Sequence, residues 1–257
     1  MSTTDGWDPA QYNRFALERE APYWDLVRLV QPVPGAHLVD LGCGDGRLTA
    51  RLHETLAAAD TLGLDSSPAM LSRAAGYSSA HVTFEHADIA TWERPDHYDV
   101  VLANASLQWV PDHRGVLARW ARSLRAGGQL AVQVPANADH PAHLVADELA
   151  GELLTDPPSD PVATNVLAPE EYAEVLDGLG FDPQHVRLQV YLHHLDSTAD
   201  VVEWVKGTTL TRFKEPFGDE GWQRFVDLYR QRLLGVLGDR SPYAYPFKRI
   251  LLWGRRS

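Results

Sequence analysis

The sequence predicts an α/β fold, with one seven-stranded, mostly parallel sheet and helices on both faces. Short apolar runs alternate with longer amphipathic segments through the first half of the chain, which is typical of βαβ units. One of these apolar runs leads directly into a glycine-rich turn and then a helix. At 257 residues the chain is long enough for one such domain with a helical insertion.

The first half supplies five of the strands, at residues 37–41, 61–65, 82–85, 98–103 and 129–134. Helices are expected between them at residues 47–58, 67–75 and 113–124. The second helix carries its own start signals, because Ser67 is a good N-cap residue and Pro68 occupies the first helical position. Right-handed crossovers through such helices make the strands parallel.

One or two helices are expected before the sheet, at residues 9–30, and prolines at 32 and 34 end them. After the fifth strand the pattern predicts helices at 140–153, 169–179, 199–208 and 219–237, and strands at 186–195 and 247–253. We predict a single domain over residues 1–257. Within it, residues 1–33 form a helical cover and residues 197–242 form a helical insertion on the substrate side.

The charge balance argues against nucleic acid as a partner. The formal net charge is −12 and no block of Lys or Arg interrupts it, so a phosphate backbone would be repelled. A single cysteine, Cys43, excludes an intramolecular disulfide and favours a reducing compartment. Residues 1–8 are polar and acidic, and no apolar run is long enough for a bilayer, so we expect a cytoplasmic protein without membrane contact. We also expect a monomer.

The strongest motif is the glycine turn after the first strand, Val39-Asp40-Leu41-Gly42-Cys43-Gly44-Asp45-Gly46. Glycines allow the backbone to turn tightly and let a ligand approach without a Cβ in the way. The third glycine of a dinucleotide fingerprint would fall at position 47, where Arg47 stands, so a nicotinamide oxidoreductase is disfavoured. The predicted cofactor contacts from this turn are Asp40, Gly42, Cys43 and Gly44.

Polar residues also follow the next three strands. Asp65 can accept both hydroxyls of a ribose, although an Asp before Ser66, Ser67 and Pro68 can also cap the next helix. Asp88 and Ile89 follow the third strand, and their plain interpretation is a loop carboxylate and a core residue. Further predicted contacts are Ser66, Met70, Asn104 and Ser106.

The turn resembles the first motif of the class I S-adenosylmethionine-dependent methyltransferases, which have a Rossmann-like fold. That resemblance implies S-adenosyl-L-methionine as cofactor and S-adenosyl-L-homocysteine as product. It also implies that Asp88 accepts from the adenine amine, with Ile89 and Met70 packing the ring. Residues 104–107 read Asn-Ala-Ser-Leu, which is not the Asn/Asp-Pro-Pro-aromatic turn of DNA adenine methyltransferases, and the Asp-Pro-Pro-Ser at 156–159 falls too late.

The resemblance narrows to the trans-aconitate 2-methyltransferase family over nearly the whole chain. The blocks that carry it are 7–9 with Tyr12, Phe15 and Arg19, then 64–70, 103–113, 130–135, 191–194, 203–205 and 246–249. It implies formation of a methyl ester on a small polycarboxylate, trans-aconitate. A carboxylate is already deprotonated at neutral pH, so catalysis would be positioning, with no catalytic base and no metal.

The expected acceptor contacts are cations and one aromatic. Arg19, Arg212 and Arg249 can hold carboxylates bidentately, while His193 is a weaker donor and Trp109 lines the pocket. Each has a plain alternative, as a surface charge or a core aromatic. His193 and His194 are adjacent on a strand, so one faces in and the other out.

Two other functions stay open. A methyltransferase acting at O, N or C of another metabolite would need a base such as His193 or His113, and its rate would fall at low pH. A regulator that binds the cofactor would never turn over. His140 and His143 have helical i, i+3 spacing, but no Cys cluster or paired carboxylates join them, so no metal is expected.

Overall fold

The computed structural model describes residues 16–257, with side chains from residue 20 onward. The part of the predicted first helix that precedes residue 16 lies outside this range. The chain divides into two compact units. The sheet unit comprises Ala21–Pro135, Asn165–Gln189 and Arg249–Ser257, and the helical unit comprises Ala136–Thr164 and Val190–Lys248, together with the described residues up to Glu20.

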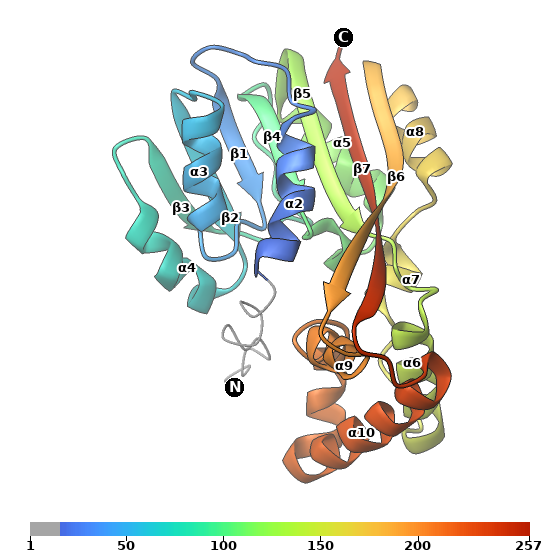
Figure 1. The fold of residues 1–257 in the computed structure, drawn as a ribbon. Helices are drawn as coiled ribbons and strands as arrows, with labels where there is room; N and C mark the ends of the chain where they lie inside the picture. The colour runs from blue at the N-terminus through green and yellow to red at the C-terminus, as the bar shows by residue number, and fades with distance from the viewer. Residues whose placement is uncertain (1–15) are drawn as a thin grey trace. The chain divides into compact units, whose positions relative to one another are not determined.

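The sheet has seven strands in the order β3-β2-β1-β4-β5-β7-β6 (Figure 1). They are β1 (His37–Leu41), β2 (Asp60–Asp65), β3 (Val82–His86), β4 (Tyr98–Asn104), β5 (Leu124–Pro135), β6 (Phe181–Leu195) and β7 (Tyr243–Arg256). The first five strands pair in parallel, and β7 pairs antiparallel to β5. The predicted mostly parallel α/β fold is confirmed.

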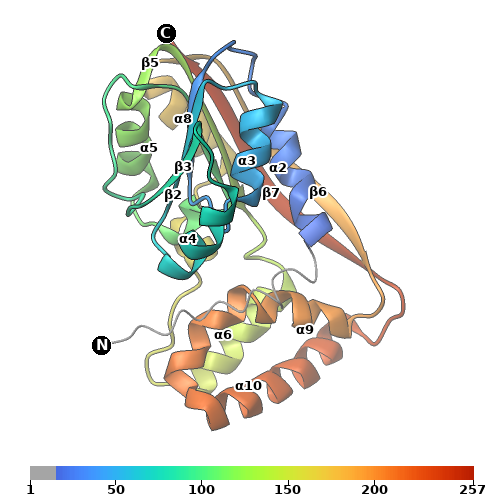
Figure 2. The same cartoon turned by 90° about the vertical axis from the view of Figure 1, so that its left-hand side faces the viewer.

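Helices cover both faces of the sheet unit. They are α2 (Ala16–Val27, from Ala21 onward), α3 (Arg47–Thr55), α4 (Pro68–Ala74), α5 (His113–Arg122) and α8 (Pro169–Gly178). Figure 2 shows α2 and α3 on one side of the sheet and α5 and α8 on the other. On the first side, Leu26 and Leu52 pack with alternate strand residues such as Leu102 in a buried apolar cluster. Such packing fixes which strand side chains point toward α2 and α3.

The helical unit has its own core. Its helices are α6 (Pro141–Leu153), α7 (Pro161–Asn165, up to Thr164), α9 (Ala199–Lys206), η3 (Thr209–Phe213) and α10 (Lys214–Leu237). Trp204, Phe213 and Tyr229 are fully or almost fully buried in one cluster with apolar residues of α6. The predicted insertion, residues 197–242, falls within this unit together with α6. The single domain, the cover role of 1–33 and the substrate-side role of 197–242 stay predictions.

The main differences from the sequence prediction are strand lengths and two short helices. β5, β6 and β7 begin before their apolar runs, because ladder hydrogen bonds and not side-chain polarity define a strand; Leu124, for example, already pairs with Tyr98. α7 lies between the predicted helices at 140–153 and 169–179, where no helix was expected, and η2 (Leu107–Trp109) follows β4. α10 begins five residues before its predicted start and is broken at Gly218, whose φ of 61° is non-helical. No helix of the described chain is long and apolar enough to cross a bilayer.

Candidate functional site

The carboxyl ends of the parallel strands bring the predicted cofactor residues to one edge of the sheet. The N–H groups of Gly42 and Cys43 donate to the Leu64 carbonyl at 2.7 and 2.9 Å, which ties the end of β1 to that of β2. Ser106, after β4, donates its hydroxyl to the Leu41 carbonyl at 2.6 Å. Ala87, after β3, donates its N–H to the Asp65 carbonyl at 3.1 Å. Four separate motifs therefore form one continuous edge.

The glycine turn needs glycine for two different reasons. Gly42 and Gly44 both lie in the left-handed region, with φ of 79° and 57°. A Cβ on Gly42 would stand 2.3 Å from the Cβ of Ser106, so the turn and the β4 loop touch there. A Cβ on Gly44 would meet nothing within 4 Å. Gly42 thus allows close packing against Ser106, whereas Gly44 leaves open space beside the turn.

Asp65 fastens the turn to the end of β2. Its Oδ2 accepts the Gly44 N–H at 2.9 Å and its Oδ1 accepts the Ser67 N–H at 2.8 Å. The Ser67 hydroxyl itself caps α4 by accepting the Met70 N–H at 3.3 Å. Because each carboxylate oxygen has more than one lone pair, Asp65 can still accept from a ligand hydroxyl. Ser66 is exposed and Met70 is half-buried.

Two ionisable groups of the turn are buried. Asp40 accepts the Thr49 hydroxyl at 2.6 Å. Burial raises the pKa of Asp40 to about 6, against the lowering effect of the Thr49 bond and with a smaller contribution from Asp65. Burial likewise raises the pKa of the Cys43 thiol, followed by the effects of nearby carboxylates, so the thiol stays protonated at neutral pH. Burial therefore disfavours a thiolate at Cys43.

The loop after β3 presents Asp88 at the surface. Asp88 is exposed, and its Oδ1 accepts the Ala90 N–H at 2.9 Å. The carbonyl of the half-buried Ile89 accepts from the indole of Trp120 at 3.0 Å. Both residues thus belong to a fixed turn at the same edge as Asp65.

His113 anchors the loop after β4 through hydrogen bonds from its imidazole ring. Its Nε2 lies 2.9 Å from the Leu107 carbonyl and its Nδ1 lies 2.6 Å from the Tyr172 hydroxyl. A carbonyl only accepts, so Nε2 carries the proton and Nδ1 accepts from Tyr172. Burial lowers the pKa of His113, although the bonds to backbone carbonyls raise it. Both ring nitrogens are occupied, and this geometry leaves neither for an acceptor. Trp109 in the same loop is 44% exposed.

Asn104 and Arg249 place two buried polar groups at this edge. The Asn104 Oδ1 is buried and has no hydrogen-bond partner in the described part of the chain. Arg249, on β7 opposite Pro135, is 6% exposed and donates from a guanidinium nitrogen to the Gln133 Oε1 at 3.2 Å. Gln133 is fully buried and was not predicted as a site residue. The side chain of Arg19 lies outside the described residues.

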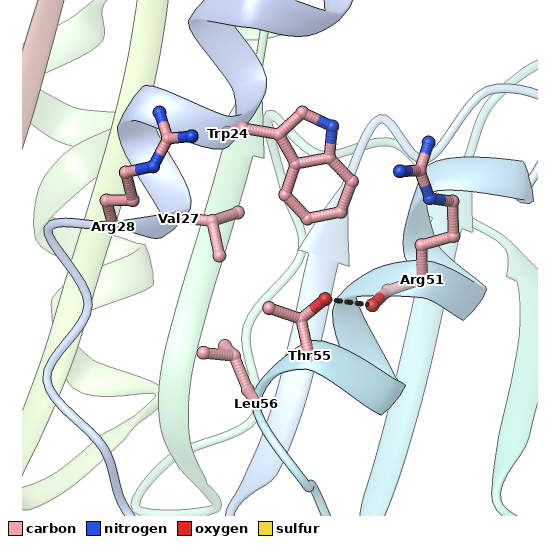
Figure 3. Close-up of a pocket in the computed structure, with 6 residues that line it drawn as sticks. All are labelled: Trp24, Val27, Arg28, Arg51, Thr55 and Leu56. Carbon is pink, nitrogen blue, oxygen red and sulfur yellow. Dashed lines mark hydrogen bonds between the residues drawn. The ribbon is translucent and has the colours of Figure 1, made fainter.

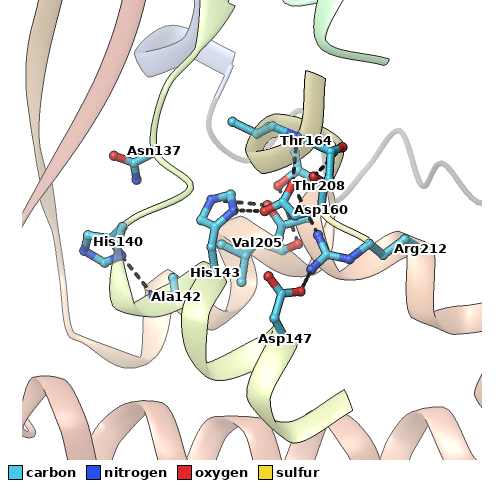
Figure 4. Close-up of polar contacts among 12 residues, drawn as sticks. Asn137, His140, Ala142, His143, Asp147, Asp160, Thr164, Val205, Thr208 and Arg212 are labelled. Carbon is cyan, nitrogen blue, oxygen red and sulfur yellow. Dashed lines mark hydrogen bonds and ion pairs between the residues drawn. The ribbon is translucent and has the colours of Figure 1, made fainter. Parts of the chain in front are cut away.

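Arg212 lies in the helical unit, in a cluster that the motifs did not predict (Figure 4). Its guanidinium pairs with Asp147 and, at 3.4 Å, with Asp160. His143 bonds to the other Asp160 oxygen at 2.6 Å. Burial raises the pKa of Asp160, but His143 and Arg212 outweigh it and hold that pKa below its usual value. The available signal was the four-residue spacing of His143 and Asp147, which share one face of α6.

His193 also lies in the helical unit, and it faces inward. It is 7% exposed and its ring centroid is 4.9 Å from that of Trp204. His194 is exposed, which confirms that one of the pair faces in and the other out. In the described part of the chain, no group of three or more His, Cys, Asp or Glu residues could hold a metal ion.

A surface cavity of about 440 Å³ lies apart from these groups (Figure 3). It is lined by side chains of α2, α3 and the residues that follow each of them, namely Trp24, Val27, Arg28, Arg51, Thr55 and Leu56. The Arg51 guanidinium lies 4.6 Å from the centre of the Trp24 ring. None of the predicted site residues with described side chains lines this cavity.

The sequence is similar to known methyltransferases. A family model described as a methyltransferase domain matches residues 38–128. A trans-aconitate 2-methyltransferase from Deinococcus radiodurans is 40% identical over 256 residues, which covers 97% of this chain and 98% of the relative. A protein of the same name from Streptomyces avermitilis is 37% identical over 255 residues, which covers 95% and 94%.

Solved structures show the same fold at low identity. The YcgJ protein from Bacillus subtilis has a TM-score of 0.61 at 16% identity, over 92% of this chain and 98% of that one. A Haemonchus contortus phosphoethanolamine N-methyltransferase, solved with phosphomonomethylethanolamine and S-adenosylhomocysteine, has a TM-score of 0.60 at 16% identity, over 100% of this chain and 60% of that one.

The sheet order, the glycine turn and these similarities together define an S-adenosylmethionine-dependent methyltransferase. Similarity to relatives over nearly the full length narrows the class of methyltransferase to one family. The chain belongs to the trans-aconitate 2-methyltransferase family.

The residues at the edge fit the cofactor of this class. Open space beside Gly44 allows a ligand to approach the backbone, and Asp65 retains acceptor capacity for hydroxyls. The buried, unpaired Asn104 Oδ1 suits a donor such as an amino group. When bound, S-adenosylmethionine supplies an electrophilic methyl carbon on a sulfonium.

Proposed function

We propose that this enzyme methylates a carboxylate oxygen of a small polycarboxylate, and that trans-aconitate is the acceptor. The observation that carries the proposal is the buried guanidinium of Arg249 at the carboxyl edge of the sheet, on the strand next to β5. A buried cation beside a cofactor edge suits an anionic acceptor. The names of the two relatives support the same acceptor.

The proposed methyl transfer requires the protein mainly to position the acceptor carboxylate. The acceptor carboxylate would supply the electron pair of the new O–CH₃ bond, and the pair of the broken S–CH₃ bond would remain on sulfur. No proton moves, so no general base is needed. Arg249 would orient the acceptor and offset its charge, while Arg19, Arg212, His193 and Trp109 remain proposed further contacts. For Arg212 a carboxylate ligand would have to compete with Asp147 and Asp160.

The proposal extends to the cofactor contacts. Asp40, Gly42, Cys43 and Gly44 would form the cradle of the amino-acid tail, Asp65 and Ser66 the ribose site, and Met70, Asp88 and Ile89 the adenine site. Asn104 and Ser106 would close it from β4. The acceptor is a small anion, and we infer a cytoplasmic monomer without a nucleic-acid or membrane partner.

The first experiment is methyl transfer from labelled S-adenosylmethionine to trans-aconitate, cis-aconitate, isocitrate and citrate, with the product identified by mass. Ester formation is expected, with a rate that stays flat between about pH 6 and 8, because the acceptor is ionised throughout that range. A rate that falls below about pH 6.5 would instead indicate a histidine base. Cofactor binding with no transfer to any acid would contradict the proposal.

Replacing Asp65 by alanine is expected to weaken S-adenosylmethionine binding by about 1–3 kcal/mol, the usual cost of leaving buried polar partners unmatched. Isothermal titration calorimetry measures this. Asp45→Ala is the matched control, since Asp45 lies in the same turn and its carboxylate accepts the Arg47 N–H at 3.2 Å. Equal affinities of the two variants would refute the ribose assignment.

A further inference from the structure

Three polar side chains form a row on one face of the sheet unit, at its carboxyl edge. Side chains two residues apart on a strand point to the same face. Leu102, Ala131 and Leu251 all belong to the apolar cluster on the α2 and α3 side. Two residues further toward the edge, their strands present Asn104, Gln133 and Arg249. The apolar face therefore ends in an amide, an amide and a guanidinium.

The pairing register makes these three groups neighbours. Asn104 is the direct partner of Gln133 between β4 and β5. Gln133 is paired with Leu251 on β7, and Arg249 with Pro135, so Gln133 and Arg249 are diagonal neighbours on the same face. Their contact at 3.2 Å follows from that register.

The orientation of the Gln133 amide is fixed by this contact. A guanidinium only donates, so the oxygen of the amide must face Arg249 and the NH₂ group must point away from it. The Gln133 side chain is 0% exposed, and its Nε2 has no hydrogen-bond partner in the described part of the chain. A buried donor without a partner is costly, and an anionic ligand would satisfy it.

We propose that Gln133 and Arg249 form a clamp for one carboxylate of the acceptor, with Gln133 as a specificity residue. The inference rests on the proposed function. The clamp joins an amide N–H and a guanidinium, both donors, next to the Asn104 oxygen, which suits a donor on the cofactor side. A carboxylate whose lone pairs are engaged by these donors is a poor nucleophile. The oxygen that receives the methyl group therefore belongs to a second carboxylate, and the enzyme selects acids with at least two.

Gln133→Glu is the decisive variant. A glutamate keeps the shape of the side chain and still accepts from Arg249, so a purely structural role of Gln133 would be retained. The variant cannot bind an anion at this position, because the substitution replaces the amide donor by a negative charge that neutralises Arg249. We expect the KM for trans-aconitate to rise at least about tenfold, the effect of one lost charge-assisted hydrogen bond, while the dissociation constant of S-adenosylmethionine stays within about twofold.

Gln129→Met is the matched control. Gln129 is also fully buried on β5 and on the same face, but the indole of Trp253 and the backbone of Gln31 satisfy its amide. This variant is expected to lower stability and leave the KM of the folded enzyme unchanged. Gln133→Met, which removes both polar atoms, is expected to raise the KM like Gln133→Glu if the clamp exists.

A second measurement tests the need for two carboxylates. The wild-type enzyme should methylate crotonic acid, which has one carboxyl group, at least about tenfold less efficiently than trans-aconitate. Suppose that the wild-type enzyme methylates trans-aconitate. An unchanged KM for trans-aconitate in Gln133→Glu would then overturn the clamp, and so would equal wild-type efficiency with crotonic acid and trans-aconitate. Either result would leave the proposed function standing. A wild-type enzyme that methylates no carboxylic acid would overturn the proposed function and the clamp with it.

Discussion

Replacing Gly42 by alanine is expected to destabilise the fold by about 2–5 kcal/mol, the sum of left-handed strain and overpacking. The added Cβ would stand 2.3 Å from the Ser106 Cβ and 2.9 Å from its hydroxyl oxygen, which bonds to Leu41. The turn and the β4 loop would have to move apart. The midpoint of urea unfolding, at constant slope, measures the loss.

Gly44→Ala is the matched control for this prediction. Its φ of 57° carries similar strain, but the new Cβ meets no atom within 4 Å. We expect a loss of only about 1–2 kcal/mol in stability, together with weaker S-adenosylmethionine binding because the Cβ enters the proposed cofactor space. Equal destabilisation by the two variants would contradict the different reasons assigned to the two glycines.

The second large effect is expected for Arg212→Met in the helical unit. The variant removes the cation that pairs with Asp147 and leaves the buried Asp160 with His143 alone, and breaking a buried pair in this way costs about 3 kcal/mol or more. Urea unfolding at about pH 7 measures the loss. The Asp160 pKa is held low in the fold, so its contribution is present above its unfolded pKa and is lost as the pH falls. The difference between wild type and variant should therefore shrink below about pH 4.

Arg232→Met is the control for Arg212. Arg232 pairs with Glu152 of α6, and both side chains are largely exposed, at 40% and 48%. Solvent screens such a pair, and its loss should destabilise the fold much less than the loss of Arg212. If Arg212→Met costs no more than Arg232→Met, the Arg212 cluster does not stabilise the helical unit. An intact fold with a raised acceptor KM would then favour a ligand role for Arg212.

The sequence was most informative about features whose conformation depends on residues that are neighbours in the chain. The turn from Gly42 to Gly46 and the Ser67-Pro68 helix start are local, because backbone conformation follows from the residues themselves. The strands were found at the right places, but β5, β6 and β7 proved longer than their apolar runs. Their ends depend on which neighbours supply ladder hydrogen bonds, and periodicity does not contain that information.

The sequence by itself determined the fold class, the cofactor motifs and the order in which they reach one sheet edge. Tertiary structure decided the partners. Arg249 contacts Gln133 from 116 positions away, and Arg212 contacts Asp147 from 65 positions away. His113, a possible base by its sequence alone, proved to be held between Leu107 and Tyr172. A local pattern shows which face of an element is buried, whereas strand order, register and helix packing determine which buried groups meet.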